Sequence, residues 1–166
     1  NSDSAVRRAA RVGDTWFVNP HATTATIKRQ MTLYRAELAR LGKPFPRVLP
    51  FFKEIFCAGD TRTALEMAGP YLAQKYRTYA AWGQDAVMPG DETFHQPFES
   101  LLRDRFVLGS PEECYEQLQP YWDDVGANVL LFRTHWSGMP LGHALGSMRL
   151  ISDELLPALR RVKAGD

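Results

Sequence analysis

The chain has 166 residues, which is enough for one domain with a buried core. Its 45% of apolar and 23% of charged residues are ordinary for a globular protein, and its net charge of +1 favours neither nucleic acid nor an anionic membrane as a partner. No apolar run is long enough to span a membrane. Cys57 and Cys114 form no CxxC pair, so we expect no metal site, no disulfide framework and a reducing cytoplasm.

The first four residues, Asn-Ser-Asp-Ser, are typical of a helix N-terminus, and Gly13 ends the helix predicted over residues 5–12. In an α/β protein such a helix follows a strand, but no strand precedes this one. We therefore expect the chain to be the second part of a larger α/β domain. On this interpretation residues 1–166 form a single partial domain.

Three segments have the composition of β-strands. Residues 14–18 are aromatic and β-branched, and Asn19-Pro20 ends them. Residues 47–58 are apolar on both faces, as in a parallel strand that is covered on both sides. Residues 128–134 form the third predicted strand.

Helices are predicted wherever apolar residues recur at helical spacing. Beyond the first, these are residues 26–41, 62–79, 99–105, 111–124 and 141–162. Pro70 is expected to kink or divide its helix. Ser110-Pro111-Glu112-Glu113 is a specific start signal, with Ser as the cap, Pro at the first position and Glu three residues after the cap. Residues 82–98 are long for a loop, so we expect an insertion or a mobile lid there.

The alternation of strands and helices predicts an α/β fold with three parallel strands, flanking helices and right-handed crossovers. Three strands cannot close a barrel, because a complete (β/α)₈ barrel needs eight. The sheet should then expose an edge, and we expect homo-oligomers.

Ser2 and Ser4 stand at a helix N-terminus, where free N–H groups and the helix dipole favour an anion such as a phosphate. Plain helix capping explains the same residues equally simply. Both interpretations remain open on these residues alone.

A second group of candidates follows the predicted strands, whose C-terminal ends face the active site in parallel α/β folds. Arg133, His135 and Trp136 end the third strand, and His21 follows the first. The alternatives are an Arg133 paired inside the sheet, a hydrogen-bonded His135 and a solvated His21. Glu54 lies in the middle of the second strand, where an unpaired charge is costly, so we predict an ion pair between Glu54 and Arg133.

Five segments together resemble the C-terminal half of the bacterial luciferase-like family of flavin-dependent monooxygenases and oxidoreductases. They are, in chain order, SDSAVRRAARVGD at 2–14, FKEIFCAGDT at 52–61, GSPEE at 109–113, RTHWSGMP at 133–140 and LLPALR at 155–160. Ser137 departs from the pattern, because Pro is frequent there in the family. The resemblance implies a TIM barrel, of which this chain is the C-terminal part.

The resemblance also implies ligands and roles. Reduced FMN is the expected cofactor, with a deazaflavin as the alternative, and Asn1, Ser2, Ser4 and Ala5 would hold its phosphate. His21, Arg133, His135 and Trp136 would line a substrate pocket or contact a lid. A small organic substrate and a flavin reductase are the implied partners. The catalytic residues themselves are expected outside this chain, since the family's first strands supply most of them.

Three functions follow from the resemblance. The leading one is a monooxygenase that oxidises an organic substrate with reduced flavin and dioxygen. This chain would be its C-terminal part and would be inactive alone. The second is a deazaflavin-dependent oxidoreductase that transfers hydride. The third is a non-catalytic flavin-binding or interaction protein with a shortened barrel.

Overall fold

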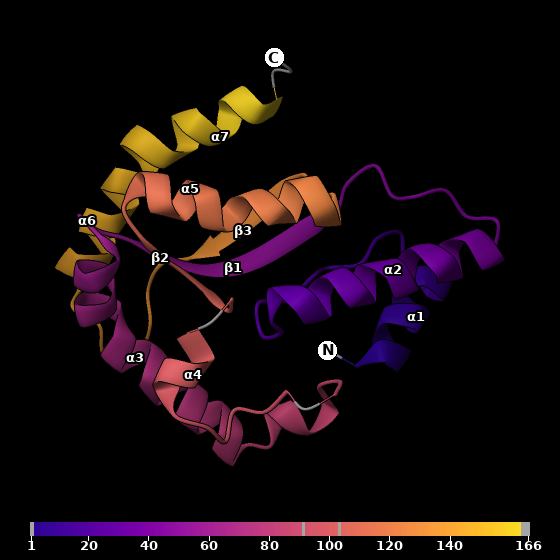
Figure 1. The fold of residues 1–166 in the computed structure, drawn as a ribbon, viewed down its shortest axis with the longest axis horizontal. Coiled ribbons are helices and arrows are strands. Elements are labelled where there is room, and N and C mark those ends of the chain that lie inside the picture. The colour runs from indigo at the N-terminus through magenta and orange to yellow at the C-terminus, as the bar shows by residue number, and fades with distance from the viewer. Residues whose placement is uncertain (1, 91, 103, 164–166) are drawn as a thin grey trace.

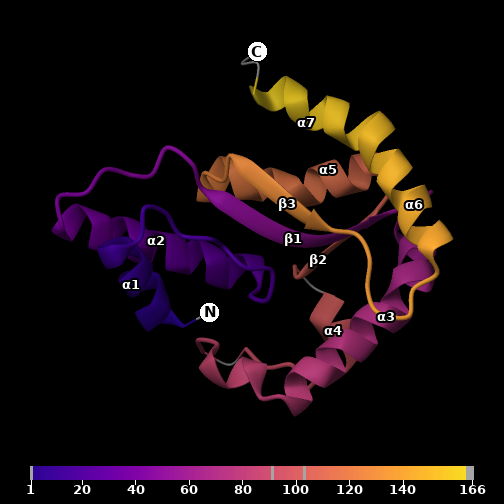
Figure 2. The same cartoon turned by 180° about the vertical axis from the view of Figure 1, so that it is seen from behind.

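The protein is described from a computed structural model that covers residues 2–90, 92–102 and 104–163, with only the backbone at 162 and 163. Three parallel strands form one sheet, with α5 above it and α3 below it in the view of Figure 1. α1 and α2 lie beside one end of the sheet, and Figure 2 shows α6 and α7 wrapping around its other side. The fold is α/β, as predicted, and the sheet does not close into a barrel.

The central strand is β1 (Pro50–Cys57), which pairs with β2 (Phe106–Gly109) along one edge and β3 (Val129–Arg133) along the other. In this register Glu54 lies between Phe106 and Arg133. The helices share the covering of the sheet and its ends. They are α1 (Asp3–Val12), α2 (Thr24–Arg40), α3 (Thr61–Ala81), α4 (Phe98–Leu102), α5 (Pro111–Pro120), α6 (Leu141–Leu150) and α7 (Leu156–Lys163), with a 3₁₀ turn at Gln84–Val87 and π turns at Tyr121–Val125 and Ile151–Leu155.

The predicted strand at 14–18 is wrong as a strand, because only Val18 pairs with β1. Its N–H donates to the Pro50 carbonyl at 3.0 Å, and its carbonyl accepts the Phe52 N–H at 2.9 Å. The N–H groups of Phe52 and Ala58 point to the same edge of β1, because an even number of residues separates them. Val18 and β2 therefore pair with different parts of that one edge. Pro20 follows two residues later and has no N–H to extend the ladder.

The sequence prediction missed β2. Its four buried residues are too short to show a period, and they lie directly before the Ser110 start signal. The helix predicted over 99–105 ends earlier, at Leu102, because the chain must extend before it joins the sheet.

Two of the helical segments contain a proline, and the chain follows a different course at each. Pro70 does not divide α3, which runs unbroken for 21 residues, because its ring lies on the exposed side where water can satisfy the freed carbonyl. The single helix predicted over 141–162 contains a π turn at Ile151–Leu155. Pro157 lies just beyond that turn and cannot donate to the carbonyl four residues back, so a wider turn fits there.

The two faces of β1 have different coverings. On one face Phe51 stacks on Tyr121 with ring centroids 4.2 Å apart. Lys53 is fully buried on that face, and its ammonium donates to the Asp104 carbonyl at 3.0 Å. Burial lowers the pKa of Lys53 to about 7. The opposite face, which carries Glu54, packs against α3 and is the face that positions the site described below.

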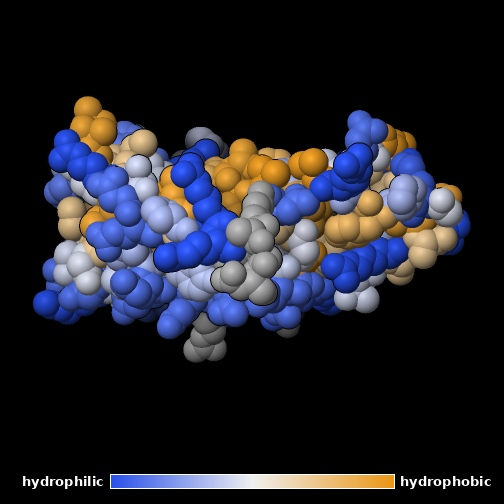
Figure 3. Space-filling view, turned by 90° about the horizontal axis from the view of Figure 1, so that it is seen from above, coloured by the Kyte–Doolittle hydropathy of each residue, from blue (hydrophilic) through white to orange (hydrophobic). Residues whose placement is uncertain are grey.

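The outer side of β3 is exposed, as expected for an open sheet. Val129 and Leu131 each retain 39% of their accessible surface. An apolar hollow of about 510 Å³ lies between β3 and the C-terminal helix, lined by Trp122, Leu156 and Leu159 among others. Seen from above, apolar atoms gather in bands between polar patches (Figure 3).

The capping box of α5 provides a stability test. The Ser110 hydroxyl accepts the Glu113 N–H at 3.2 Å, and the Glu113 carboxylate accepts the Ser110 N–H at 2.8 Å. Ser110→Ala should lower the free energy of unfolding by about 1 kcal/mol. Ser152→Ala, at an exposed position, is the matched control, and equal denaturation midpoints for the two variants would contradict the capping role.

Candidate functional site

The N-terminus of α1 is arranged to accept an anion. The Ser2 hydroxyl accepts the Ala5 N–H at 3.2 Å and contacts the Ser4 hydroxyl at 3.0 Å. The N–H groups of Asp3 and Ser4, in the first turn, have no partner within the helix. Asn1, the remaining residue of the predicted phosphate site, lies outside the described residues.

The Asp3 carboxylate does not repel an anion from this helix end. Arg29 donates two parallel hydrogen bonds to it, each 2.8 Å long, and Gln30 donates a third at 3.1 Å. The hydrogen bond from Arg29 lowers the pKa of Asp3 to about 2. Its charge is therefore matched by a guanidinium, and the free N–H groups keep their positive potential.

A pocket of about 590 Å³ adjoins this end of α1. Its lining comes from α1, α2 and the segment 89–105, and comprises Asp3, Thr23, Thr26, Arg29, Pro89, Gly90, Glu92, Gln96, Ser100 and Arg105. The described residues of this lining include two carboxylates, Asp3 and Glu92, and two guanidiniums, Arg29 and Arg105. An anion beside α1 would bind to the first-turn N–H groups, which have no partner within the helix.

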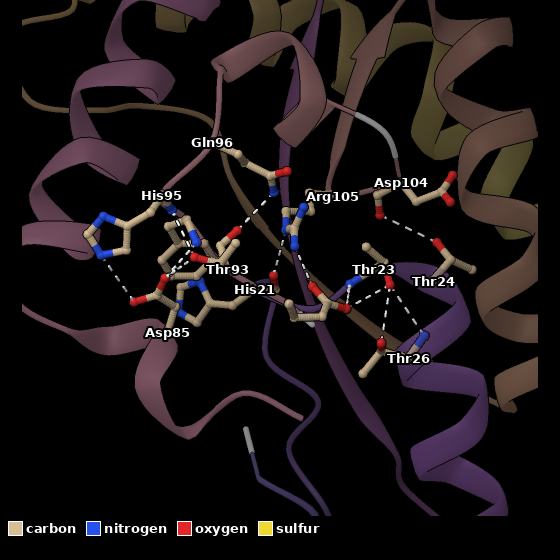
Figure 4. Close-up of polar contacts among 12 residues, drawn as sticks. His21, Thr23, Thr24, Thr26, Asp85, Thr93, His95, Gln96, Asp104 and Arg105 are labelled. Carbon is tan, nitrogen blue, oxygen red and sulfur yellow. Dashed lines mark hydrogen bonds and ion pairs between the residues drawn. The ribbon is translucent and has the colours of Figure 1, made fainter. Parts of the chain in front are cut away.

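Glu92 ties the long segment at 82–98 to the start of α2. One carboxylate oxygen accepts the Thr23 N–H at 2.9 Å and the Thr23 hydroxyl at 2.7 Å (Figure 4). The other pairs with Arg105, whose Nε donates to the His21 carbonyl at 3.0 Å. Burial opposes ionisation of Glu92, but the hydrogen bonds from the threonines and the charge of Arg105 lower its pKa overall.

Asp85 also holds the segment at 82–98 together through hydrogen bonds within it. Its carboxylate accepts the Phe94 N–H at 2.6 Å and the Thr93 hydroxyl at 2.8 Å, and His95 lies 4.0 Å away (Figure 4). Phe94 and Met88 bury their side chains in the core. The segment is therefore folded against the domain and held by two carboxylates, the buried Asp85 and the half-buried Glu92.

His21 is half-buried, where one interpretation of the sequence had it solvated. Its ring lies edge-on to Tyr76, Tyr79 and Phe94, with centroids 5.4–6.2 Å apart, and its Nδ1 has no hydrogen-bond partner among the described residues. Burial, reinforced by the charge of Lys75, lowers the pKa of His21 to about 4. The imidazole is thus neutral at pH 7.

Glu54 is fully buried and receives donors from two elements. Lys75 and Tyr76 of α3 contact it, the Tyr76 hydroxyl at 3.0 Å, and Trp136 Nε1 donates to it at 3.2 Å. Arg133 Nη1 lies 3.8 Å from the same carboxylate, which is an ion-pair distance rather than a hydrogen bond. The structure thus brings the expected pair together but gives Glu54 a closer cation in Lys75. Burial raises the pKa of Tyr76 well above its usual range.

A second pocket of about 390 Å³ opens above this cluster. It is lined by α3 and by the chain that follows β3, and comprises Tyr71, Gln74, Lys75, Thr78, Tyr79, Trp82, Arg133, His135, Trp136 and Ser137. Three of the four predicted pocket residues are therefore brought together here. The fourth, His21, lies between the two pockets, since its ring contacts Tyr79 and its carbonyl binds Arg105.

The turn after β3 fixes the orientation of these side chains. His135 Nε2 lies 3.1 Å from the Met139 carbonyl, and the Met139 N–H donates to the Trp136 carbonyl at 3.1 Å. Gly138 has φ of +82°, a value that side chains other than glycine rarely adopt. The turn folds Trp136 back onto Glu54.

Several site residues were missed from the sequence. Lys75, Tyr76, Glu92 and Arg105 complete the two charge clusters from segments distant in the chain. Lys75 lies in the helix predicted over residues 62–79, but no spacing rule pairs a helix lysine with a strand glutamate. Across residues 2–90, 92–102 and 104–163, no three His, Cys, Asp or Glu side chains gather as a metal site. Within the same residues no helix is long and apolar enough to cross a membrane.

The family model described as luciferase-like monooxygenase matches residues 1–128 of the chain. The chain therefore belongs to the luciferase-like monooxygenase family. No curated protein is similar enough to count as a match.

Solved structures show the same fold at low sequence identity. Monooxygenase RslO1 from Streptomyces bottropensis is 18% identical, with a TM-score of 0.70 over 95% of this chain and 45% of its own. The oxygenating constituent of 3,6-diketocamphane monooxygenase from Pseudomonas putida, in complex with FMN, is 17% identical, with a TM-score of 0.63; the match covers 92% of this chain and 44% of that one. Flavoprotein 390 is 14% identical, with a TM-score of 0.67; the match covers 100% of this chain and 67% of that one. The chain thus spans less than half of the length of the two monooxygenases.

The lowered pKa of His21 predicts a pH-dependent stability. The folded state binds fewer protons than the unfolded state between about pH 4 and pH 6.5, so the free energy of unfolding should fall as the pH falls through that window. The loss should reach up to about 3 kcal/mol. His21→Leu should make the profile flatter, whereas His95→Gln, at an exposed histidine, should not. An NMR titration that placed the pKa of His21 near 6.5 would contradict the burial argument.

Proposed function

We propose that the protein to which this chain belongs is an FMN-dependent monooxygenase that oxidises a small organic substrate with dioxygen. The observation that carries the proposal is the N-terminus of α1, where Asp3 lines a pocket and is neutralised by Arg29, and where the first-turn N–H groups have no partner within the helix. A helix end of this kind suits a phosphate. Family membership and the FMN-bound relative support FMN as the group that brings it.

The chain's residues would bind and orient the cofactor. Asn1, Ser2, Ser4 and the Ala5 backbone hold the phosphate at the start of α1. Bound reduced FMN supplies the electrons and the reaction with dioxygen. His21 contributes a neutral, apolar wall, since its lowered pKa keeps it uncharged at pH 7.

The remaining roles concern the substrate and the exclusion of water. Arg133, His135 and Trp136 line the pocket above Glu54, where the substrate would bind. Residues 82–98 act as a lid, whose closed form is held by the Glu92–Arg105 pair. We further propose a cytoplasmic homo-oligomer supplied with reduced flavin by a separate reductase.

A second candidate is a non-catalytic flavin-binding protein. Its support is that all of this chain matches 67% of flavoprotein 390, so a flavoprotein with a shorter chain has a similar fold. A deazaflavin-dependent hydride transfer on the same fold is the third candidate. Turnover of dioxygen with reduced FMN separates the first candidate from both others.

Ser2→Ala tests the phosphate site in the full-length protein. Loss of one hydrogen bond to a charged group should weaken FMN binding by about 1.5–3 kcal/mol in a fluorescence titration. Ser152→Ala is the control, and its affinity should equal that of the wild type.

Unchanged FMN affinity in Ser2→Ala would remove Ser2 from the site. Tight binding of a deazaflavin without binding of FMN would overturn the monooxygenase proposal in favour of the hydride-transfer alternative.

A further inference from the structure

The pocket above Glu54 has an excess of positive charge. The described residues that line it include Lys75 and Arg133 but neither Asp nor Glu. The carboxylate that pairs with both cations is Glu54, which lies fully buried beneath the pocket. One negative charge therefore faces two positive ones, and His21 adds none because its pKa is lowered to about 4.

Glu54 is already engaged by other donors. Lys75, the Tyr76 hydroxyl and Trp136 Nε1 all contact its two oxygens. Lys75 is 12% exposed and lies against the carboxylate, so its charge is neutralised there. The surplus charge is consequently that of Arg133.

Arg133 is free to bind something else. Its side chain is 40% exposed, and it donates no hydrogen bond to any residue in the described part of the chain. Its guanidinium stands 5.3 Å above the Phe52 ring, which holds its plane at the edge of the pocket. A guanidinium with open donors matches the two oxygens of a carboxylate.

The rest of the pocket favours a flat apolar body beside that anion. Tyr71, Tyr79, Trp82 and Trp136 supply its aromatic surface, and the Tyr79 and Trp82 rings lie 6.1 Å apart. Trp82 is 69% exposed, which is unusual for a side chain of this size. Aromatic walls with one convergent charged group are typical of small-molecule sites.

We propose that this pocket binds an organic carboxylate with a flat apolar body, through Arg133, as the substrate of the enzyme. The inference rests on the proposed function for its catalytic meaning, but the binding preference follows from the pocket alone. Lys75 acts as a positioning residue, because it satisfies Glu54 and leaves Arg133 available. The phosphate site at α1 is separate from this pocket and shares no lining residue with it.

The test compares two probes that differ in charge. 2-Naphthoate and its neutral counterpart 2-naphthylmethanol are titrated into the full-length protein without flavin by isothermal calorimetry. Naphthoate should bind at least tenfold more tightly than the alcohol. Arg133→Gln should remove that preference, Arg133→Lys should keep part of it, and Arg62→Gln, an exposed arginine at the start of α3, should keep all of it.

Two results would overturn the proposal. One is equal affinity of the two probes for the wild-type protein, and the other is an undiminished preference in a folded Arg133→Gln variant. If Arg133→Gln fails to fold, Trp82→Ala decides instead, since truncating this exposed ring should weaken both probes by a similar factor, and unchanged binding would contradict the site.

A parallel titration with FMN separates the two proposals. Failure of the wild-type protein to bind FMN would refute the proposed function while leaving the naphthoate preference intact. Tight FMN binding with no preference for naphthoate would refute the inference and leave the function standing.

Discussion

The burial of the Glu54 carboxylate constrains much of this structure. A carboxylate with no exposed surface is costly unless donors surround it, and here the donors come from α3 and from the turn after β3. The central strand, its covering helix and the chain that leaves the sheet are thereby joined at one point. The same contacts hold Lys75 and Trp136, two of the side chains that line the pocket above Glu54.

The two pockets of the candidate site differ in their side-chain charge. Near α1, carboxylates and guanidiniums are matched, so binding there depends on backbone N–H groups. Above Glu54 the side-chain charges do not balance, and Arg133 remains available. His21 stands between the two regions as a neutral spacer, with its carbonyl bound to Arg105 and its ring against Tyr79. A phosphate-bearing cofactor and an anionic substrate could then occupy neighbouring but distinct places.

The sequence predicted what depends on local signals. The capped starts of α1 and α5 and the buried strand β1 follow from caps and apolar runs, and the cost of an unpaired charge predicted the Glu54–Arg133 ion pair. Other features depend on tertiary contacts. The strand β2 is too short for a period, the 14–18 segment meets β1 at one residue, and Lys75 reaches Glu54 only because α3 crosses that face of the sheet. One interpretation had His21 solvated, because the aromatic residues that cover part of it are distant in the chain.

Glu54 joins β1, α3 and the 136–140 turn through its charge. The free energy of unfolding of Glu54→Gln, measured by chemical denaturation in the full-length protein, tests this most directly. We expect a loss of about 3–5 kcal/mol, because the near-isosteric amide leaves Lys75 without its counter-charge in a buried place. A change within about 0.5 kcal/mol of the wild type, the size typical of a surface substitution, would contradict it.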